Sequence, residues 1–242
     1  AEWARAELKR RETMLLRLPE ALWYPGPMSK AGYAVGKRGP KRGDVKHSAE
    51  GDHLDEMHQL LTGPAQKSWH FTVKKDGTIE QHYEIDVHCW HAGDTDDDGG
   101  VRANIDLVGI EHMGYGTTPL TDKQVEATVR ITQFGADQWG FEKFGRYPVL
   151  NAVANKVWTL AEHNQVSDTP TACPSGRIPW ATILAKLNEG DDMLSPVQQE
   201  ANQRAAVLTA ILGKVLAAIG EDTEPKLTPF EKEVLKQIVA DW

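Results

Sequence analysis

Leu107-Val108-Gly109-Ile110-Glu111 is the stretch that decides the fold. Its first four residues form a short and nearly continuous apolar run, which is typical of a strand that is covered on both faces. We therefore expect a buried central strand here, with Glu111 emerging at the edge of the sheet where the strand ends.

Further strands are predicted on both sides of this run in the sequence. The segments Trp69–Val73 and Thr78–Tyr83 flank an Asp76-Gly77 pair, which is a strong signal for a hairpin turn between two antiparallel strands. Val157–Leu160 predicts another strand, which ends shortly before His163. Earlier in the chain, Val45 and His47 are expected on one side of a strand end.

Helices are predicted between these strands. Apolar residues at helical spacing begin at Leu54, a capping box at Thr121-Asp122-Lys123-Gln124 opens a second helix, and Ile178–Leu187 predicts a closing helix. The order of strands and helices predicts an α/β fold with a central mixed β-sheet flanked by helices on both faces.

Three regions are expected from changes in composition. Residues 1–42 predict an N-terminal helix followed by an irregular basic arm rich in Gly and Pro, and residues 43–190 form the main domain. Residues 191–242 predict a tail of two helices, which begin near Ser195-Pro196 and Thr228-Pro229. Each tail helix carries an apolar stripe that must be buried against the other helix, the main domain or a second copy of the chain, so a homo-oligomer formed through the tail is one expectation.

Charge argues against nucleic acid as a partner. The net charge is −8, and because residues 1–46 hold 11 Lys or Arg against 5 Asp or Glu, the remainder carries −14. The longest apolar stretch, Ala205–Gly220, is interrupted by Lys214 and falls short of the roughly 18–20 residues of a membrane-spanning helix. The charged N-terminus does not resemble a signal peptide, so we expect no membrane insertion and no signal peptide.

Two imidazoles and one thiol, from His47, His163 and Cys173, make up a donor set that suits zinc and leaves one coordination position open. Spacing alone does not select these residues from the nine histidines of the chain. The run His88-Cys89-Trp90-His91 and the pair His53 and His58 are rival clusters, and a single histidine is more often structural than a ligand.

Several blocks together resemble a known family. They are His47-Ser48-Ala49-Glu50-Gly51, Trp69-His70-Phe71 with Lys75-Asp76-Gly77-Thr78-Ile79, Trp90-His91-Ala92-Gly93, Asn104, Gly109-Ile110-Glu111, and His163 with Thr171-Ala172-Cys173-Pro174. In order and spacing they resemble the zinc-dependent type 2 N-acetylmuramoyl-L-alanine amidases, a family that includes phage amidase lysozymes and peptidoglycan recognition proteins. The His-Ser-Ala-Glu-Gly form after a Gly- and Pro-rich arm is most similar to endolysins of phages that infect actinobacteria.

The resemblance implies roles for eight residues. One zinc ion is expected on His47, His163 and Cys173, with Glu111 as the catalytic carboxylate and Thr171 steadying the oxyanion, while His91, Asn104 and Trp69 are expected to bind substrate. An alternative for Glu111 is a structural carboxylate paired with Arg102 or a lysine. The family also implies an amidase fold for residues 43–190.

The implied activity is zinc-dependent hydrolysis of the amide bond between N-acetylmuramic acid and L-alanine in bacterial peptidoglycan. An endolysin of this kind is made in the host cytoplasm and acts on the cell wall. Two alternatives are a peptidoglycan-binding module without catalysis and a structural phage component that assembles through its tail.

Three positions depart from the family pattern. Trp69 stands where many members have a catalytic tyrosine, which shifts more of the chemistry to Glu111. Lys46 and Ser48 flank the first predicted ligand, where a His-His pair is common. Asn164-Gln165 follows His163 in place of an acidic residue, so the hydrogen-bond partner of that imidazole stays undetermined.

Overall fold

A computed structural model describes residues 16–32, 37–93 and 102–188. All of these residues belong to the first of two units, which span residues 1–190 and 191–242. The two predicted tail helices, and any N-terminal helix before residue 16, lie outside the described residues.

The described residues form a seven-stranded mixed sheet in the order β1-β4-β3-β5-β2-β7-β6, in which only the β3–β4 pair is antiparallel. The strands are β1 (Leu22–Trp23), β2 (Gly43–Ser48), β3 (Phe71–Val73), β4 (Ile79–Gln81), β5 (Leu107–His112), β6 (Lys143–Arg146) and β7 (Val157–Glu162). The predicted mixed sheet is confirmed, and so is the hairpin, whose Gly77 has the positive φ of 85° that this turn requires.

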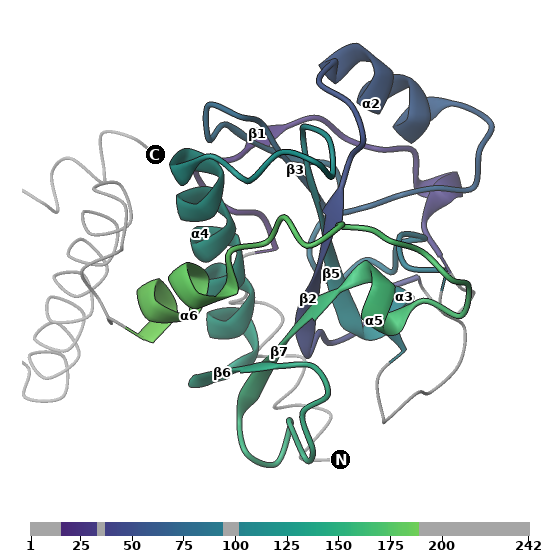
Figure 1. Cartoon of the computed structure of the whole chain (residues 1–242). Coiled ribbons are helices and arrows are strands. Elements are labelled where there is room, and N and C mark those ends of the chain that lie inside the picture. The colour runs from purple at the N-terminus through teal and green to yellow at the C-terminus, as the bar shows by residue number, and fades with distance from the viewer. Residues whose placement is uncertain (1–15, 33–36, 94–101, 189–242) are drawn as a thin grey trace, which may run out of the picture. The chain divides into compact units, whose positions relative to one another are not determined.

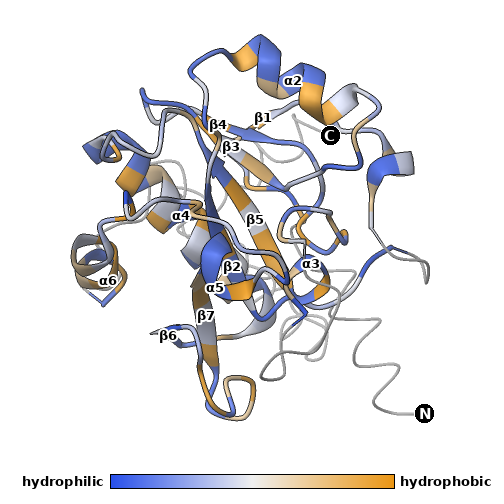
Figure 2. Cartoon of the chain, turned by 45° about the vertical axis from the view of Figure 1, so that its right-hand side comes forward, coloured by the Kyte–Doolittle hydropathy of each residue, from blue (hydrophilic) through white to orange (hydrophobic). Residues whose placement is uncertain are grey.

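The strand predicted from the apolar run is β5, and it occupies the middle of the sheet. Leu107, Val108 and Ile110 are at most 1% exposed, and apolar residues predominate along β5 in Figure 2. Glu111, near the end of the strand, is partly exposed, as the sequence predicts.

Strand β2 is longer than expected, because six residues from Gly43 to Ser48 pair with β5 and all are buried. Asp44 and Lys46 interrupt its apolar pattern, yet they form an ion pair inside the protein. The Asp44 carboxylate also accepts hydrogen bonds from the Thr132 hydroxyl at 2.7 Å and the Trp158 indole N–H at 3.0 Å. These partners explain how two charged side chains can lie in the layer between β2 and a covering helix.

Helices cover both faces of the sheet. They are the 3-10 turn η1 (Met28–Lys30), α2 (Leu54–Thr62), α3 (Ala103–Asp106), α4 (Asp122–Trp139), α5 (His163–Val166) and α6 (Trp180–Asn188). Helices α4 and α6 lie together on one side of the sheet, whereas α2 lies on the other side (Figure 1). The capping box predicted for α4 is confirmed, since Thr121 and Gln124 bond to each other's backbone N–H groups.

The part of the arm that the structure describes packs more closely than expected. Lys30 and Ala31 are buried, and Ala31 forms an isolated bridge with Cys89. The Lys30 ammonium donates to the carbonyl of Leu60 at the end of α2, which joins the arm to that helix.

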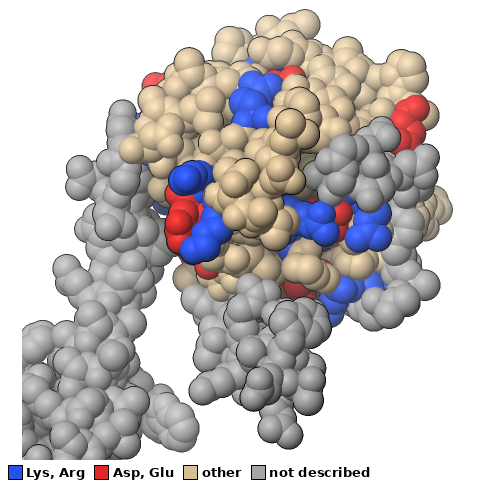
Figure 3. All heavy atoms as spheres, turned by 90° about the horizontal axis from the view of Figure 1, so that it is seen from below, with Lys and Arg blue, Asp and Glu red and all other residues tan. Residues whose placement is uncertain are grey.

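Charges of both signs are mixed on the surface. On the face drawn in Figure 3, Lys and Arg side chains lie beside Asp and Glu side chains in the described part of the chain. Among the ion pairs of the described residues, Arg38 contacts Glu84 and Asp86 at 2.7 and 2.6 Å. Among the helices of residues 16–32, 37–93 and 102–188, none has the length and hydropathy needed to cross a bilayer.

Buried neutral imidazoles make the stability of the fold depend on pH. The His82 ring donates to the Tyr24 carbonyl and accepts from the Thr72 hydroxyl, and burial lowers its pKa to about 4, while Glu80 and His58 affect it less. The unfolded chain therefore binds a proton that the folded chain does not bind, so stability falls as the pH drops from about 6.5 toward 4.

We expect His82→Gln to flatten this dependence by up to one proton, or about 1.4 kcal/mol per pH unit. Urea unfolding of both proteins between pH 7 and 4 measures it. Equal slopes of unfolding free energy against pH would show that His82 does not resist protonation in the folded state.

Candidate active site

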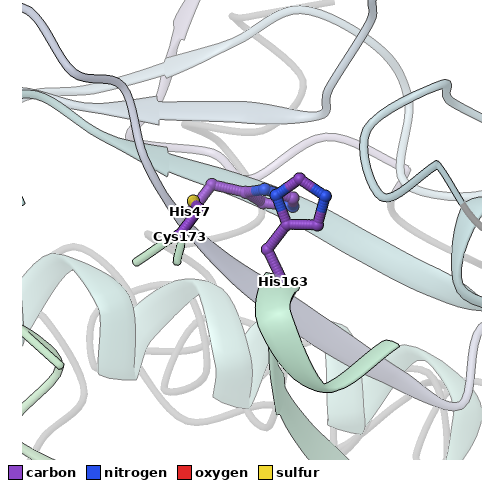
Figure 4. A group of neighbouring side chains, drawn as sticks. All are labelled: His47, His163 and Cys173. Atoms are coloured by element: carbon purple, nitrogen blue, oxygen red, sulfur yellow. The ribbon is translucent and has the colours of Figure 1, made fainter. Parts of the chain in front are cut away.

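Three side chains from distant parts of the sequence converge at the carboxyl ends of β2 and β7. His47 lies on β2, His163 is the first residue of α5 directly after β7, and Cys173 lies in the following loop. One donor atom from each lies within 4.8 Å of the others, and Figure 4 shows the side chains directed toward one another. Within the described ranges, this is the only group of His, Cys, Asp or Glu side chains that converges closely enough to hold a metal ion.

The ionisation of these groups suits a cation. Burial lowers the pKa of both His47 and His163, so each imidazole is neutral with a lone pair to offer. Burial, reinforced by the Glu111 carboxylate, raises the pKa of Cys173 to about 12. Its sulfur accepts the Ser48 N–H at 3.2 Å. Such a thiol loses its proton only to a strong positive charge, and the donor set therefore fits a thiophilic divalent cation.

The imidazoles of His47 and His163 each form a hydrogen-bond contact with the segment Trp90-His91-Ala92-Gly93. His47 Nε2 lies 3.1 Å from His91 Nδ1, and His163 Nε2 donates to the Ala92 carbonyl at 3.2 Å. The partner of His163, which the sequence left undetermined, is thus a backbone oxygen.

Glu111 lies directly opposite His47 in the β2–β5 register, with its Oε1 4.0 Å from His47 Nδ1. Its Oε2 is buried and has no hydrogen-bond partner among the described residues. Burial raises the pKa of Glu111 to about 7, with Glu50 raising it further and Lys67 opposing both. A carboxyl group that titrates near neutrality can act as a general base.

The structural alternative for Glu111 was an ion pair with Arg102 or a lysine, and no Lys or Arg of the described residues lies within ion-pair distance of its carboxyl group. Arg102 contacts Asp106, at 3.4 Å between Nη2 and Oδ1. The Glu111 carboxyl group instead lies beside His47, one of the converging donors, at 4.0 Å between Oε1 and Nδ1.

The site opens into a cavity of about 460 Å³. It is lined by His47, Ser48, Ala49, Glu50, Met57, Leu60, Gln66, Lys67, Trp69, Trp90, His91, Gly93, Glu111, His163, Ser167, Thr169, Thr171 and Cys173. Thr171 is fixed at this wall, since its hydroxyl oxygen accepts the Cys173 N–H at 3.2 Å.

The three residues expected to bind substrate differ in position. Trp69 and His91 line the cavity but are 3% and 9% exposed. The Trp69 indole N–H donates to Thr72 at 2.8 Å, so its polar atom is already used within the fold. Asn104 is fully buried and does not line the cavity.

The sequence did not single out two charged residues at this site. Lys67 is the one Lys or Arg that lines the cavity within the described residues. The one sequence signal for this location is that Lys67 lies two residues before Trp69. Arg177 is buried and donates to the Ser48 hydroxyl and the His112 carbonyl at 2.9 and 3.3 Å. It therefore ties the loop after Cys173 to the ends of β2 and β5.

The rival clusters do not form a comparable site. Cys89 is fully buried, and His58 pairs with Glu80 at 2.7 Å while it stacks on Tyr24. Neither belongs to a converging donor group among the described residues.

Comparison with known proteins places this site in a family. The sequence model described as N-acetylmuramoyl-L-alanine amidase matches residues 38–176. The chain is 31% identical over 120 residues to the 1,6-anhydro-N-acetylmuramyl-L-alanine amidase AmpD of Enterobacter cloacae, a match that covers 50% of this chain and 57% of that protein. The AmpD of Citrobacter freundii is 29% identical over 130 residues, which are 53% of this chain and 62% of that protein. The chain thus spans little more than half of these relatives.

Solved structures show the same fold. A crystal structure of a selenomethionine AmpD derivative superposes with a TM-score of 0.54 at 21% identity, covering 71% of this chain and 96% of that one. The structure of PlyL superposes with a TM-score of 0.50 at 16% identity, covering 71% of this chain and 99% of that one. The family match includes every converging donor, Glu111 and Thr171. The chain belongs to the type 2 N-acetylmuramoyl-L-alanine amidase family, as its sequence blocks predict.

Proposed function

We propose that this chain is a zinc-dependent amidase that cleaves the bond between N-acetylmuramic acid and L-alanine in bacterial peptidoglycan, in the manner of a phage endolysin. The observation that carries the proposal is the convergence of His47, His163 and Cys173 beside the largely buried carboxyl group of Glu111. Family membership supports the bond that is cut, and the relatives are themselves named as muramyl-L-alanine amidases.

His47, His163 and Cys173 would hold one zinc ion and leave a fourth position for water or substrate. Zinc supplies Lewis acidity toward the scissile carbonyl and the attacking water. The protein supplies neutral imidazoles, a sulfur that accepts the Ser48 N–H, and a cavity that the substrate can enter.

Glu111 would act as the general base and then as the general acid. Its raised pKa lets it accept a proton from the attacking water and deliver the proton to the departing alanine nitrogen. The Thr171 hydroxyl lines the cavity and accepts the Cys173 N–H, and it would donate to the developing oxyanion. A hydroxyl stabilises that charge less than an ammonium group would.

The alternative of a binding module without catalysis is less well supported. Such a module needs the cavity but neither the thiol donor nor a carboxyl group with a raised pKa, and this chain has both. The AmpD relatives are named for 1,6-anhydro substrates, so the size of the natural substrate needs a direct comparison.

Digestion of purified cell walls by the full chain with zinc should release new alanine amino termini and no new reducing sugar ends. Dinitrophenyl labelling and a reducing-sugar assay measure the two products. A 1,6-anhydromuropeptide assayed in parallel distinguishes an endolysin, which degrades intact walls, from an enzyme restricted to small fragments. New reducing ends would indicate a glycosidase, and the absence of both products would indicate a binding module.

Glu111→Gln should lower kcat by about 10²- to 10⁴-fold because the amide cannot take up the proton of the attacking water. Its zinc content should equal that of the wild-type chain. Glu50→Gln is the matched control, since Glu50 lines the same cavity and should affect kcat far less. Equal losses in the two variants would rule out a general-base role specific to Glu111.

Cys173→Ser should weaken zinc binding by more than the roughly 10- to 100-fold that the loss of an outer-shell partner costs. Competition with a chromophoric chelator measures the affinity. Cys89→Ser serves as the control, because Cys89 is a buried thiol outside the cavity. Zinc affinity that is unchanged in Cys173→Ser would remove sulfur from the proposed site.

A further inference from the structure

One dipeptide, His91-Ala92, contacts both of the histidines that are proposed to bind zinc. The His91 ring contacts His47, and the Ala92 carbonyl contacts His163. Two neighbouring residues thus contact two proposed ligands, His47 and His163, that are 116 positions apart in the sequence.

The hydrogen positions in this arrangement follow from the partners. The Leu107 carbonyl, 3.3 Å from His91 Nε2, can only accept, so His91 carries its proton on Nε2. A neutral imidazole has one N–H group, and the Nδ1 of His91 is therefore an acceptor. The contact at 3.1 Å then requires His47 to donate from its own Nε2.

The same reasoning applies to the second imidazole. The Ala92 carbonyl accepts from His163 Nε2, so the proton of that ring is on Nε2 as well. Both rings are left with their lone pair on Nδ1. For His47 this is the nitrogen that lies 4.0 Å from Glu111 Oε1, on the side of the cavity.

The dipeptide is itself held in place at two points. The Asn104 side-chain oxygen accepts the N–H groups of His91 and Ala92 at 2.9 and 2.8 Å. The His91 ring packs against the backbone of β5 at Gly109, where a Cβ atom would lie only 2.7 Å from the ring Cγ. Asn104 and Gly109 therefore determine where the ring and the carbonyl point.

The geometry points to a tautomer-setting element: His91 and the Ala92 carbonyl, fixed by Asn104, hold His47 and His163 with Nδ1 free to bind the cation. His91 is then a positioning residue, and Asn104 supports it, in place of the substrate contacts that the family resemblance implied. This inference rests on the proposed zinc site but concerns hydrogen bonds that exist without zinc.

The direct test is ¹⁵N NMR of histidine side chains in the metal-free full chain at neutral pH, because protonated and unprotonated ring nitrogens differ widely in chemical shift. Signals are assigned with His47→Gln and His163→Gln. Both rings should carry their proton on Nε2. A proton on Nδ1 of either ring, or a mixture of the two tautomers, would overturn the inference. This measurement needs neither zinc nor substrate, so it stands even if the proposed activity is absent.

A pair of variants tests the consequence for metal binding. In His91→Asn an amide oxygen can replace Nδ1 as the acceptor for His47, whereas His91→Leu offers no acceptor. We expect zinc affinity to fall about 10- to 100-fold in His91→Leu and to stay close to wild type in His91→Asn. Zinc affinity unchanged in His91→Leu, together with a raised KM for wall fragments, would instead make His91 a substrate contact. If His91→Leu does not fold, the tautomers of the wild-type chain still decide the question.

Discussion

The register between β2 and β5 determines which side chains meet at the carboxyl edge of the sheet. In this parallel pair His47 lies opposite Glu111 and Val45 lies opposite Gly109. A shift of one residue would turn His47 to the other face of the sheet and away from Glu111. The register also places Gly109, which has no side chain, against the His91 ring, and this ring contacts His47. The proposed ligand His47, the proposed general base Glu111 and the His91 ring that contacts the ligand thus depend on a single strand alignment.

The opposite face of β2 reinforces that alignment. Asp44 and Lys46 point away from the cavity into the layer beneath α4, where Thr132 and Trp158 also donate to the carboxylate. Burying this pair costs desolvation energy, and leaving either charge unpaired in the same layer would cost about 3–5 kcal/mol more. A slipped register would break these contacts. Asp44 and Lys46, which interrupt the apolar pattern of β2 in the sequence, therefore help to define the register of the strand in the structure.

The elements that the sequence predicted are those whose signals are local. The apolar run Leu107–Ile110 predicts a strand and the Asp76-Gly77 pair predicts a hairpin turn, each from only a few neighbouring residues. Both predictions are confirmed. Strand β6, Lys143–Arg146, was missed because it is a partly exposed edge strand without an apolar run. The proposed zinc ligands and Glu111 were predicted from the family blocks, but their hydrogen bonds were not. The partner of His163 is the backbone oxygen of Ala92, 71 positions away, and no pattern of side chains encodes such a contact.

X-ray absorption spectroscopy at the zinc edge of the zinc-loaded full chain tests the central claim most directly, because it identifies the atoms bound to the metal. We predict one sulfur at about 2.3 Å and two imidazole nitrogens at about 2.0–2.1 Å, with a further light atom completing four-coordination. A spectrum without a sulfur shell, or one with only oxygen ligands, would contradict the convergence of His47, His163 and Cys173 on one zinc ion.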